Sequence, residues 1–284
     1  MPIVKVKMED VAKLAGVNKA TVSRALKGDS RISSATREKV WEAARSLGYQ
    51  PDAVARGLSS NRTGLLGIVF EDLTSPWTGE FLGGVDRVVS KQHYSLLVKC
   101  SGKTEAQRLL VARDLASRNV DGIIWIGRPF FPIAIDGPLV VVDSDPIDVE
   151  GIHVVVDVKR GAEKILKIAE GKRCEVEEGE KSFFKGLAPL LKGNESLSDS
   201  SLPFRIINSL NLTAIKGCQK DVLLCGYPHL ARLLGYYCLD WPAFELGAVA
   251  GRLSLNVIQG KGVRPEKIVV VPPLYSPEGD VISL

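Results

Sequence analysis

The sequence predicts a multidomain fold, with a small all-α head followed by a larger α/β portion. Residues 10–28, "DVAKLAGVNKATVSRALKG", hold two short runs with helical apolar spacing, and a third such run follows. From residue 65 onward, continuous Ile/Val/Leu runs alternate with amphipathic segments, which is typical of a parallel sheet covered by helices on both faces. The chain of 284 residues is long enough for two or three domains.

The head is predicted to contain three short helices around one small core. Gly16 permits a sharp turn after the first helix, Asn18 is a suitable N-cap for the second, and Ser33 is a suitable N-cap for the third. The apolar residues expected to face inward are Val11, Leu14 and Ala15, then Val22, Ala25 and Leu26, then Val40, Ala44 and Leu47. Helices this short are marginal alone, so packing on one another must hold them.

Positive charge is concentrated in this head. Residues 1–62 contain 12 Lys and Arg against 6 Asp and Glu, whereas the remainder contains 25 against 27. A basic head on a nearly neutral body suggests binding to a polyanion. The outward face of the second helix fits this reading, since small or hydroxylated residues near its N-terminus permit close approach to a phosphate and Arg24 can reach a guanine edge. A solvated amphipathic hairpin is the alternative.

The motifs "MEDVAKLAGVNKATVSRALKG" and "ISSATREKVWEAARSLGYQPDAVARGL" resemble the N-terminus of LacI/GalR-family transcription regulators. The resemblance implies a helix-turn-helix head whose second helix enters the DNA major groove. It implies base contacts from Lys19, Ala20 and Arg24. Phosphate contacts are implied for Thr21, Ser23, Ser33 and Thr36, and further contacts for the loop residues Arg31 and Ile32.

The same resemblance implies a hinge helix after "Tyr-x-Pro". Leu58 stands where family members wedge a leucine into the minor groove, with Ala55 beside it and Arg56 available to phosphates. The stretch "DAVARGLSSNRTG" is short and weakly apolar, so we expect it to be ordered by a partner. Asp52 departs from the Asn that is common in the family. A simple linker is the alternative.

The α/β portion is predicted to contain strands at "LLGIVF", "SLLVKC", "DGIIWIG", "PLVVVD" and "IHVVVDV", with helices near 78–92 and 104–118. Neither GxGxxG nor GxxxxGK[ST] appears, and the three histidines suggest no catalytic pairing, so we expect neither an enzyme nor a cofactor. The resemblance extends here to a periplasmic-binding-protein-like sensor of two Rossmann-like subdomains, with a long late helix in "DWPAFELGAVAGRLSLNVIQGK" and a late strand in "EKIVVVPPL".

The second subdomain is predicted to be reduced. The acidic run "EVEEGE" and the loop-like "KGNESLSDSSLP" occupy much of its length, and "GYPH" replaces the usual "GFDD" or "GYDD". Ligands gather at the carboxyl ends of parallel strands, where a Trp can stack on a sugar ring and an Asp or Arg can bind polar groups. The candidate effector-binding residues are Asp72, Ser75, Trp77, Thr78, Trp125, Arg128, Asp143, Asn208 and Asn211. Core packing is the alternative for each Trp.

The predicted boundaries are a helix-turn-helix domain at 1–50, a hinge at 51–63 and a sensor at 64–284, divided near 157 with a late crossover. Cys218, Cys225, His229 and Cys238 fall close together, but their spacing is poor for zinc and no metal is expected. With no signal peptide or membrane span apparent, a cytoplasmic, nucleoid-associated location is expected.

These expectations combine into a transcription repressor that binds a pseudo-palindromic operator as a homodimer and responds to a small-molecule effector. One alternative is a sugar-like small-molecule binding protein with a vestigial DNA-binding head. Another is a regulator controlled by a protein partner rather than by a metabolite.

Overall fold

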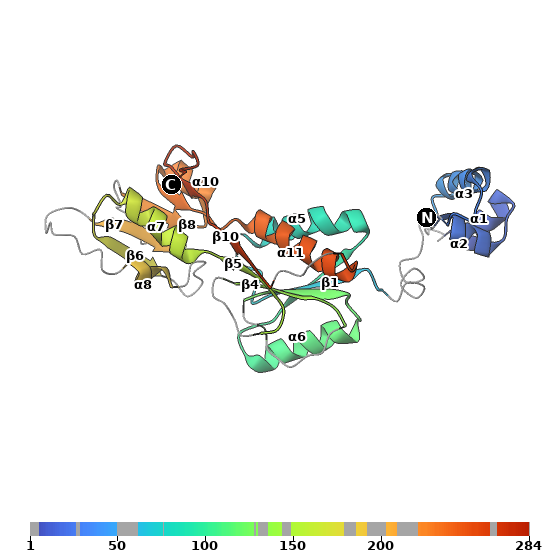
Figure 1. Cartoon of the computed structure of the whole chain (residues 1–284), viewed down its shortest axis with the longest axis horizontal. Helices are drawn as coiled ribbons and strands as arrows, with labels where there is room; N and C mark the ends of the chain where they lie inside the picture. Colours follow the sequence, from blue (N-terminus) through green and yellow to red (C-terminus); the bar gives the residue numbers. More distant parts are fainter. Residues whose placement is uncertain are drawn as a thin grey trace, which may run out of the picture. The chain divides into compact units, whose positions relative to one another are not determined.

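The computed structural model divides into two compact units, Met1–Thr63 and Gly64–Leu284 (Figure 1). The residues that the structure describes are 6–26, 29–49, 62–75, 77–127, 129, 136–143, 149–178, 186–191, 203–208, 221–261 and 266–283. None of the helices within these ranges is both long and apolar enough to cross a membrane.

The head consists of three helices: α1 (Met8–Ala15), α2 (Lys19–Leu26) and α3 (Ser34–Ser46). Its core is made of buried aliphatic side chains from all three helices, which are Val11, Ala12, Val22, Ala25, Val40, Ala43 and Ala44. Gly16 ends α1 with a φ of 66°, in the left-handed region that favours glycine. The predicted N-caps are confirmed, because the Thr21 backbone N–H donates to Asn18 Oδ1 (2.7 Å) and that of Thr36 to Ser33 Oγ (3.2 Å).

One inward residue of the head was predicted wrongly. The side chain of Leu14 is 57% exposed, and Ala12 is buried in its place. The stripe on α1 begins at Met8 and continues through Val11, Ala12 and Ala15, which are the positions i, i+3, i+4 and i+7 of one helix face. Leu14 lies about 110° around the helix from the centre of that stripe.

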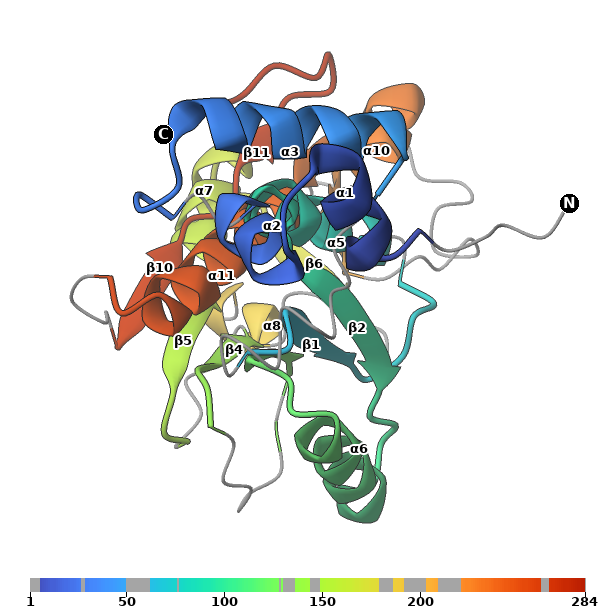
Figure 2. The same ribbon diagram turned by 90° about the vertical axis from the view of Figure 1, so that its right-hand side faces the viewer.

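The first sheet of the larger unit is entirely parallel, with the strand order β10-β5-β4-β3-β1-β2. Its strands are β1 (Leu65–Phe70), β2 (Ser95–Cys100), β3 (Gly122–Ile126), β4 (Leu139–Asp143), β5 (Ile152–Val156) and β10 (Lys267–Val270). One face is covered by α5 (Thr78–Val89) and α11 (Ala243–Ile258), and the other by α6 (Glu105–Ser117), as Figures 1 and 2 show. The short helix η1 (Ser90–Gln92) continues α5.

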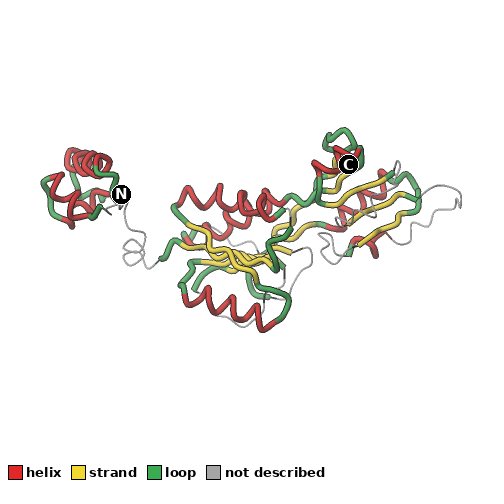
Figure 3. The backbone as a smooth tube through the Cα atoms, turned by 180° about the vertical axis from the view of Figure 1, so that it is seen from behind, coloured by secondary structure: helices red, strands yellow, loops and turns green. Residues whose placement is uncertain are grey.

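The second sheet has the order β11-β9-β8-β7-β6. Its strands are β6 (Cys174–Glu178), β7 (Phe204–Asn208), β8 (Val222–Cys225), β9 (Tyr237–Leu239) and the antiparallel β11 (Leu274–Tyr275). The helices of this lobe are α7 (Val158–Ile168), α8 (Leu187–Leu191) and α10 (Pro228–Leu234). Figure 3 shows both sheets from behind.

The acidic run in the second lobe contributes to a strand. Part of it lies in the edge strand β6, Cys174–Glu178. Glu177 pairs with Arg205 on the neighbouring strand β7, and Glu175 pairs with Arg173. An edge strand is hydrogen-bonded to a neighbouring strand on one side only. Acidic side chains on it discourage a strand of another chain from pairing with the open side.

The chain passes between the two sheets three times: through α7, between β9 and α11, and between β10 and β11. The Lys164 ammonium on α7 donates to the carbonyl oxygen of Pro272 in the third passage (2.9 Å). A Cβ at Gly161 would lie 3.2 Å from the Pro272 ring, so α7 packs tightly on that passage. The late helix and late strand therefore return to the first sheet.

Candidate functional site

The outward face of α2 is the first part of the candidate site. Lys19, Ala20 and Arg24 are exposed, and Thr21 and Ser23 are half-buried. Val22 and Ala25 point the other way, into the core. The first-turn N–H groups of a helix have no acceptor within that helix, so this end of α2 offers backbone donors beside its side chains.

Lys19 forms an ion pair across the head. Its Nζ lies 2.5 Å from Oε1 of Glu9 on α1, and both side chains are more than half exposed. The hydrogen bond raises the pKa of Lys19 and lowers that of Glu9. Because the pair is exposed and uses one nitrogen and one oxygen, water or another anion can replace Glu9 at low energetic cost.

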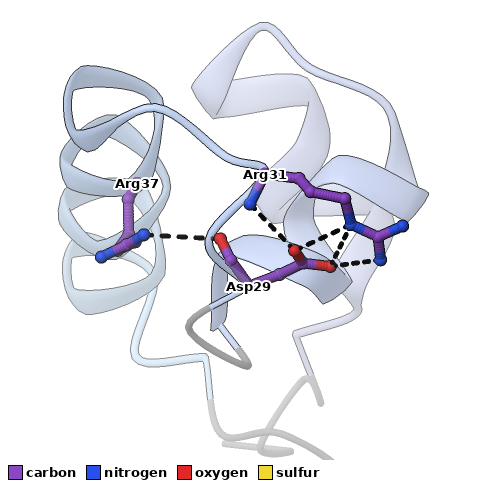
Figure 4. A network of polar contacts seen from close by, with 3 residues as sticks. All are labelled: Asp29, Arg31 and Arg37. Carbon is purple, nitrogen blue, oxygen red and sulfur yellow. Dashed lines mark hydrogen bonds and ion pairs between the residues drawn. The ribbon is translucent and has the colours of Figure 1, made fainter.

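The turn before α3 carries a second ion pair, between Asp29 and Arg31 (Figure 4). Arg31 Nε donates to Oδ1 and Oδ2 of Asp29 at 3.0 and 3.2 Å, and Nη2 donates to Oδ2 at 2.7 Å. These hydrogen bonds hold the pKa of Asp29 far below its usual range. Ile32, the next predicted contact residue, is half-buried against the head core.

Ser33 and Thr36 lie at the start of α3. Ser33 Oγ donates to Thr36 Oγ1 (2.9 Å) while it accepts from the Thr36 backbone N–H. The two hydroxyls are therefore held together at a helix N-terminus, where an anion is favoured. The predicted hinge residues Ala55, Arg56 and Leu58 lie outside the described residues.

Comparisons with known proteins give a family match for the head and a relative that covers nearly the whole chain. Residues 7–52 match the family model described as bacterial regulatory proteins, lacI family. Catabolite control protein A of Staphylococcus epidermidis is 32% identical over 300 aligned positions, which cover 94% of this chain and 87% of that protein. The chain belongs to the LacI family.

Two further relatives describe how far the LacI-family likeness extends. The sucrose operon repressor of Pediococcus pentosaceus is 39% identical over 124 residues, covering 42% of this chain and 37% of that repressor. The crystal structure of the lac repressor dimer bound to operator and the anti-inducer ONPF superposes with a TM-score of 0.72 at 17% identity, covering 98% of both chains. The latter confirms the fold, and family membership makes this chain a DNA-binding transcription regulator.

The LacI-family sensor places several candidate residues directly after β1. Asp72 Oδ1 accepts from the backbone N–H and the hydroxyl of Thr74, at 2.8 and 2.5 Å. The half-buried Trp77 contacts three aromatic rings at centroid distances of 5.8 to 6.2 Å, those of Phe70, Phe81 and Trp241. The Ser75 carbonyl accepts from the backbone N–H of Thr78 (3.1 Å).

Trp125 lies apart from this group and is packed in the core, which is the alternative given for each Trp. It is 2% exposed and packs beneath α6 with Val69, Leu115 and Ile123. Asp143 and Asn208 end β4 and β7, but their side chains lie outside the described set. Arg128 and Asn211 lie outside it entirely.

Two residues near Trp77 were missed as candidates. Trp241 is 5% exposed beside Trp77, and Asp240 immediately precedes it at the second passage between the lobes. Burial, with Glu80 and Glu245 nearby, raises the pKa of Asp240 to about 7. The segment "LDWP" after a short strand is the sequence signal that could have indicated both residues.

The cysteine and histidine residues that were weighed as zinc ligands differ in burial. Cys225 and Cys238 are buried in the sheet, His229 is exposed on α10, and Cys218 is outside the described residues. Across the part of the chain that the structure describes, no three His, Cys, Asp or Glu side chains are grouped so as to hold a metal ion.

Proposed function

We propose that this LacI-family chain is a repressor that binds a pseudo-palindromic operator as a homodimer. The head would comprise residues 1–50, the hinge 51–63 and the sensor 64–284. The observation that carries the proposal is the exposed face of α2, where Lys19, Ala20 and Arg24 lie on the side opposite the buried Val22 and Ala25. A dimer presents two such faces to two half-sites in successive major grooves.

Each predicted contact residue has a proposed part in operator binding. Lys19, Ala20 and Arg24 would read base edges, and Arg31 and Ile32 would add contacts from the turn. Phosphates would be bound by Thr21, Ser23, Ser33 and Thr36. Leu58, with Ala55 beside it and Arg56 on the phosphates, would enter the minor groove and bend the duplex. The site of action would be the nucleoid in the cytoplasm, because operators lie on the chromosome.

We further propose that the sensor binds a small molecule with sugar-like rings or hydroxyls, at the carboxyl end of β1. Trp77 supplies an aromatic face, Asp72 supplies acceptor oxygens, and the hydroxyl of the buried Thr78 has no hydrogen-bond partner among the described residues. The name of one relative agrees with this chemistry, since it is a sucrose operon repressor. An effector acts by binding one state of the sensor better than the other.

The experiment is a selection of bound duplexes from a random DNA pool with the full chain. The expected result is one enriched pseudo-palindromic sequence. Its affinity should fall steeply with salt, with a log–log slope of about −0.9 per phosphate contact. A flat salt response, or no enrichment, would favour a small-molecule binding protein with a vestigial head.

The selected duplex then serves to search for the effector. Sugars, nucleosides and phosphorylated metabolites are added singly to the complex, and the dissociation constant of the duplex is measured by fluorescence anisotropy. Sugars are expected to change it, with a matching change in tryptophan emission. A panel without effect would contradict the sugar assignment, and capture of a protein that changes operator affinity would favour control by a partner.

A further inference from the structure

The ion pair between Asp29 and Arg31 is unlike an ordinary surface pair. The Asp29 side chain is 18% exposed, whereas that of Arg31 is 76% exposed. The carboxylate is thus largely buried and the guanidinium largely exposed. Figure 4 shows the two groups facing each other. Both oxygens of Asp29 accept from Arg31, through Nε and Nη2, so one edge of the guanidinium is fixed in position and direction.

The backbone of this turn is held by other contacts. Arg37 Nη2 on α3 donates to the carbonyl oxygens of Asp29 (3.4 Å) and Ile32 (3.3 Å). The Ile32 N–H donates to the Asp29 carbonyl, and the Asp29 N–H donates to the carbonyl of Arg24 on α2 (both 3.1 Å). These backbone contacts hold the shape of the turn without Oδ2 of Asp29. The partners of Oδ2 are Nε and Nη2 of Arg31.

The fixed edge determines what Arg31 can still bind. A guanidinium has five N–H donors, and the pair with Asp29 leaves the edge formed by Nη1 and the outer hydrogen of Nη2 outside the ion pair. Two parallel donors on a rigid edge match O6 and N7 of guanine, or two phosphate oxygens. The paired side chains together carry no net charge, so Arg31 contributes direction rather than long-range attraction.

We propose that Asp29 is a positioning residue that converts Arg31 from a mobile phosphate contact into a directed, sequence-discriminating contact. The inference rests on the proposed operator binding by the head. Lys19 provides the contrast on the same head, because its pair with Glu9 is exposed on both sides and joins a single nitrogen to a single oxygen. Glu9 therefore does not fix the direction of Lys19.

The test compares full-length variants on the duplex selected by the wild-type chain and on every single-base-pair change of one half-site. Asp29→Asn keeps an oxygen acceptor for the Arg31 backbone N–H (3.0 Å) but removes the charge and the second carboxylate oxygen. It is expected to lose about tenfold discrimination at one or two base pairs. The freed Arg31 then binds phosphate, so the salt slope should steepen by about 0.9 per head.

Three further variants separate positioning from charge. Glu9→Gln removes the same charge from an exposed pair and should raise the affinity for all duplexes alike. Arg31→Ala should lose discrimination at the same base pairs as Asp29→Asn, without a steeper slope. In the Arg31→Ala background, Asp29→Asn should cause no further loss of discrimination. The single variant Asp29→Glu keeps a carboxylate and should therefore retain part of the discrimination that Asp29→Asn loses.

The proposal is overturned if Asp29→Asn discriminates as the wild type does, or if it reduces discrimination equally with Arg31 absent. Thermal unfolding of the head, followed by circular dichroism, checks that each variant folds. If the wild-type chain selects no sequence, the proposed function itself fails, and this inference fails with it. If the wild type discriminates between duplexes and the Asp29→Asn variant discriminates equally well, this inference is refuted and the proposed function is not.

Discussion

Gly84 of α5 packs directly against the carbonyl oxygen of Phe244 in α11: a Cβ at position 84 would lie 2.1 Å from that oxygen. The contact is reciprocal, because a Cβ at Gly247 of α11 would lie 2.1 Å from the carbonyl oxygen of Phe81 in α5. The two helices that cover one face of the first sheet therefore approach each other backbone to backbone, which is possible only where both lack a side chain.

Gly84→Ala is accordingly expected to destabilise the larger unit, by about 1–3 kcal/mol or more, since neither helix backbone can yield without moving from the sheet. Gly83→Ala is the matched control. A Cβ there meets nothing within 4 Å, and alanine favours helix by up to about 1 kcal/mol. Urea denaturation followed by circular dichroism measures both. Equal unfolding midpoints for the two variants would contradict the close packing.

Arg24→Ala is expected to reduce sequence discrimination by about tenfold or more at one base pair of each half-site, because a guanidinium pairs with a guanine through two hydrogen bonds. The measurement is the ratio of dissociation constants for the selected operator and its single-base-pair variants. Lys13→Ala is the control, since Lys13 is exposed on α1 and has no predicted base contact. Unchanged ratios for Arg24→Ala would refute α2 as the recognition helix.

Leu58→Ala is expected to act differently from Arg24→Ala. Without an apolar wedge in the minor groove, the duplex should bend less and the affinity should fall, while the preferred half-site sequence stays the same. Energy transfer between dyes at the two ends of the duplex reports the bend. A variant that bends the operator as the wild type does would show that residues 51–63 serve as a linker.

Asp240 predicts a pH dependence of stability. Burial, then Glu80 on α5 and Glu245 on α11, raise its pKa from an ordinary 3.8 to about 7 in the folded chain. Cys238 and Tyr275 are its other titratable neighbours. The folded state thus binds the proton more tightly than the unfolded state does. The stabilisation is present below pH 4 and is lost as the pH rises to about 7, at up to about 1.4 kcal/mol per pH unit.

Asp240→Asn should remove this slope, because an amide does not titrate in that range. Denaturation midpoints of both proteins between pH 5 and pH 8 provide the measurement. The wild type should lose stability relative to the variant as the pH rises. Parallel pH profiles would show that Asp240 titrates alike in the folded and unfolded chains.

Features set by neighbouring residues could be predicted from the sequence. Asn18 and Ser33 bind N–H groups three residues away, so a local pattern is enough to identify both caps. The continuous apolar runs identified the strands of the first sheet for the same reason. Val11, Leu14 and Ala15 also fit helical spacing, and only the packing of Met8 against the core shows that the inward face is rotated away from Leu14.

Features set by distant residues could not be predicted. In the apolar run of β3, alternation places Ile124 toward α5 and α11 but Trp125 toward α6, and no polar residue within the run marks which face is which. The contact between Trp77 and Trp241 joins two segments that lie far apart in the sequence of the larger unit. The Asp29–Arg31 pair depends on the backbone angles of a turn, which the residue types alone do not determine.

The return of α11 and β10 to the first sheet has a consequence for protein synthesis. As the nascent chain leaves the ribosome, β1 to β5 are the first strands to emerge. The helix α11, which covers one face of them together with α5, and β10, which completes their edge, are made only after β6 to β9 of the second sheet. Until then the apolar surface that this sheet forms with α5, which contains Phe70 and Phe81, lacks the cover of α11. Translation arrested before Ala243 therefore yields a chain that exposes this face and is prone to aggregate or be degraded.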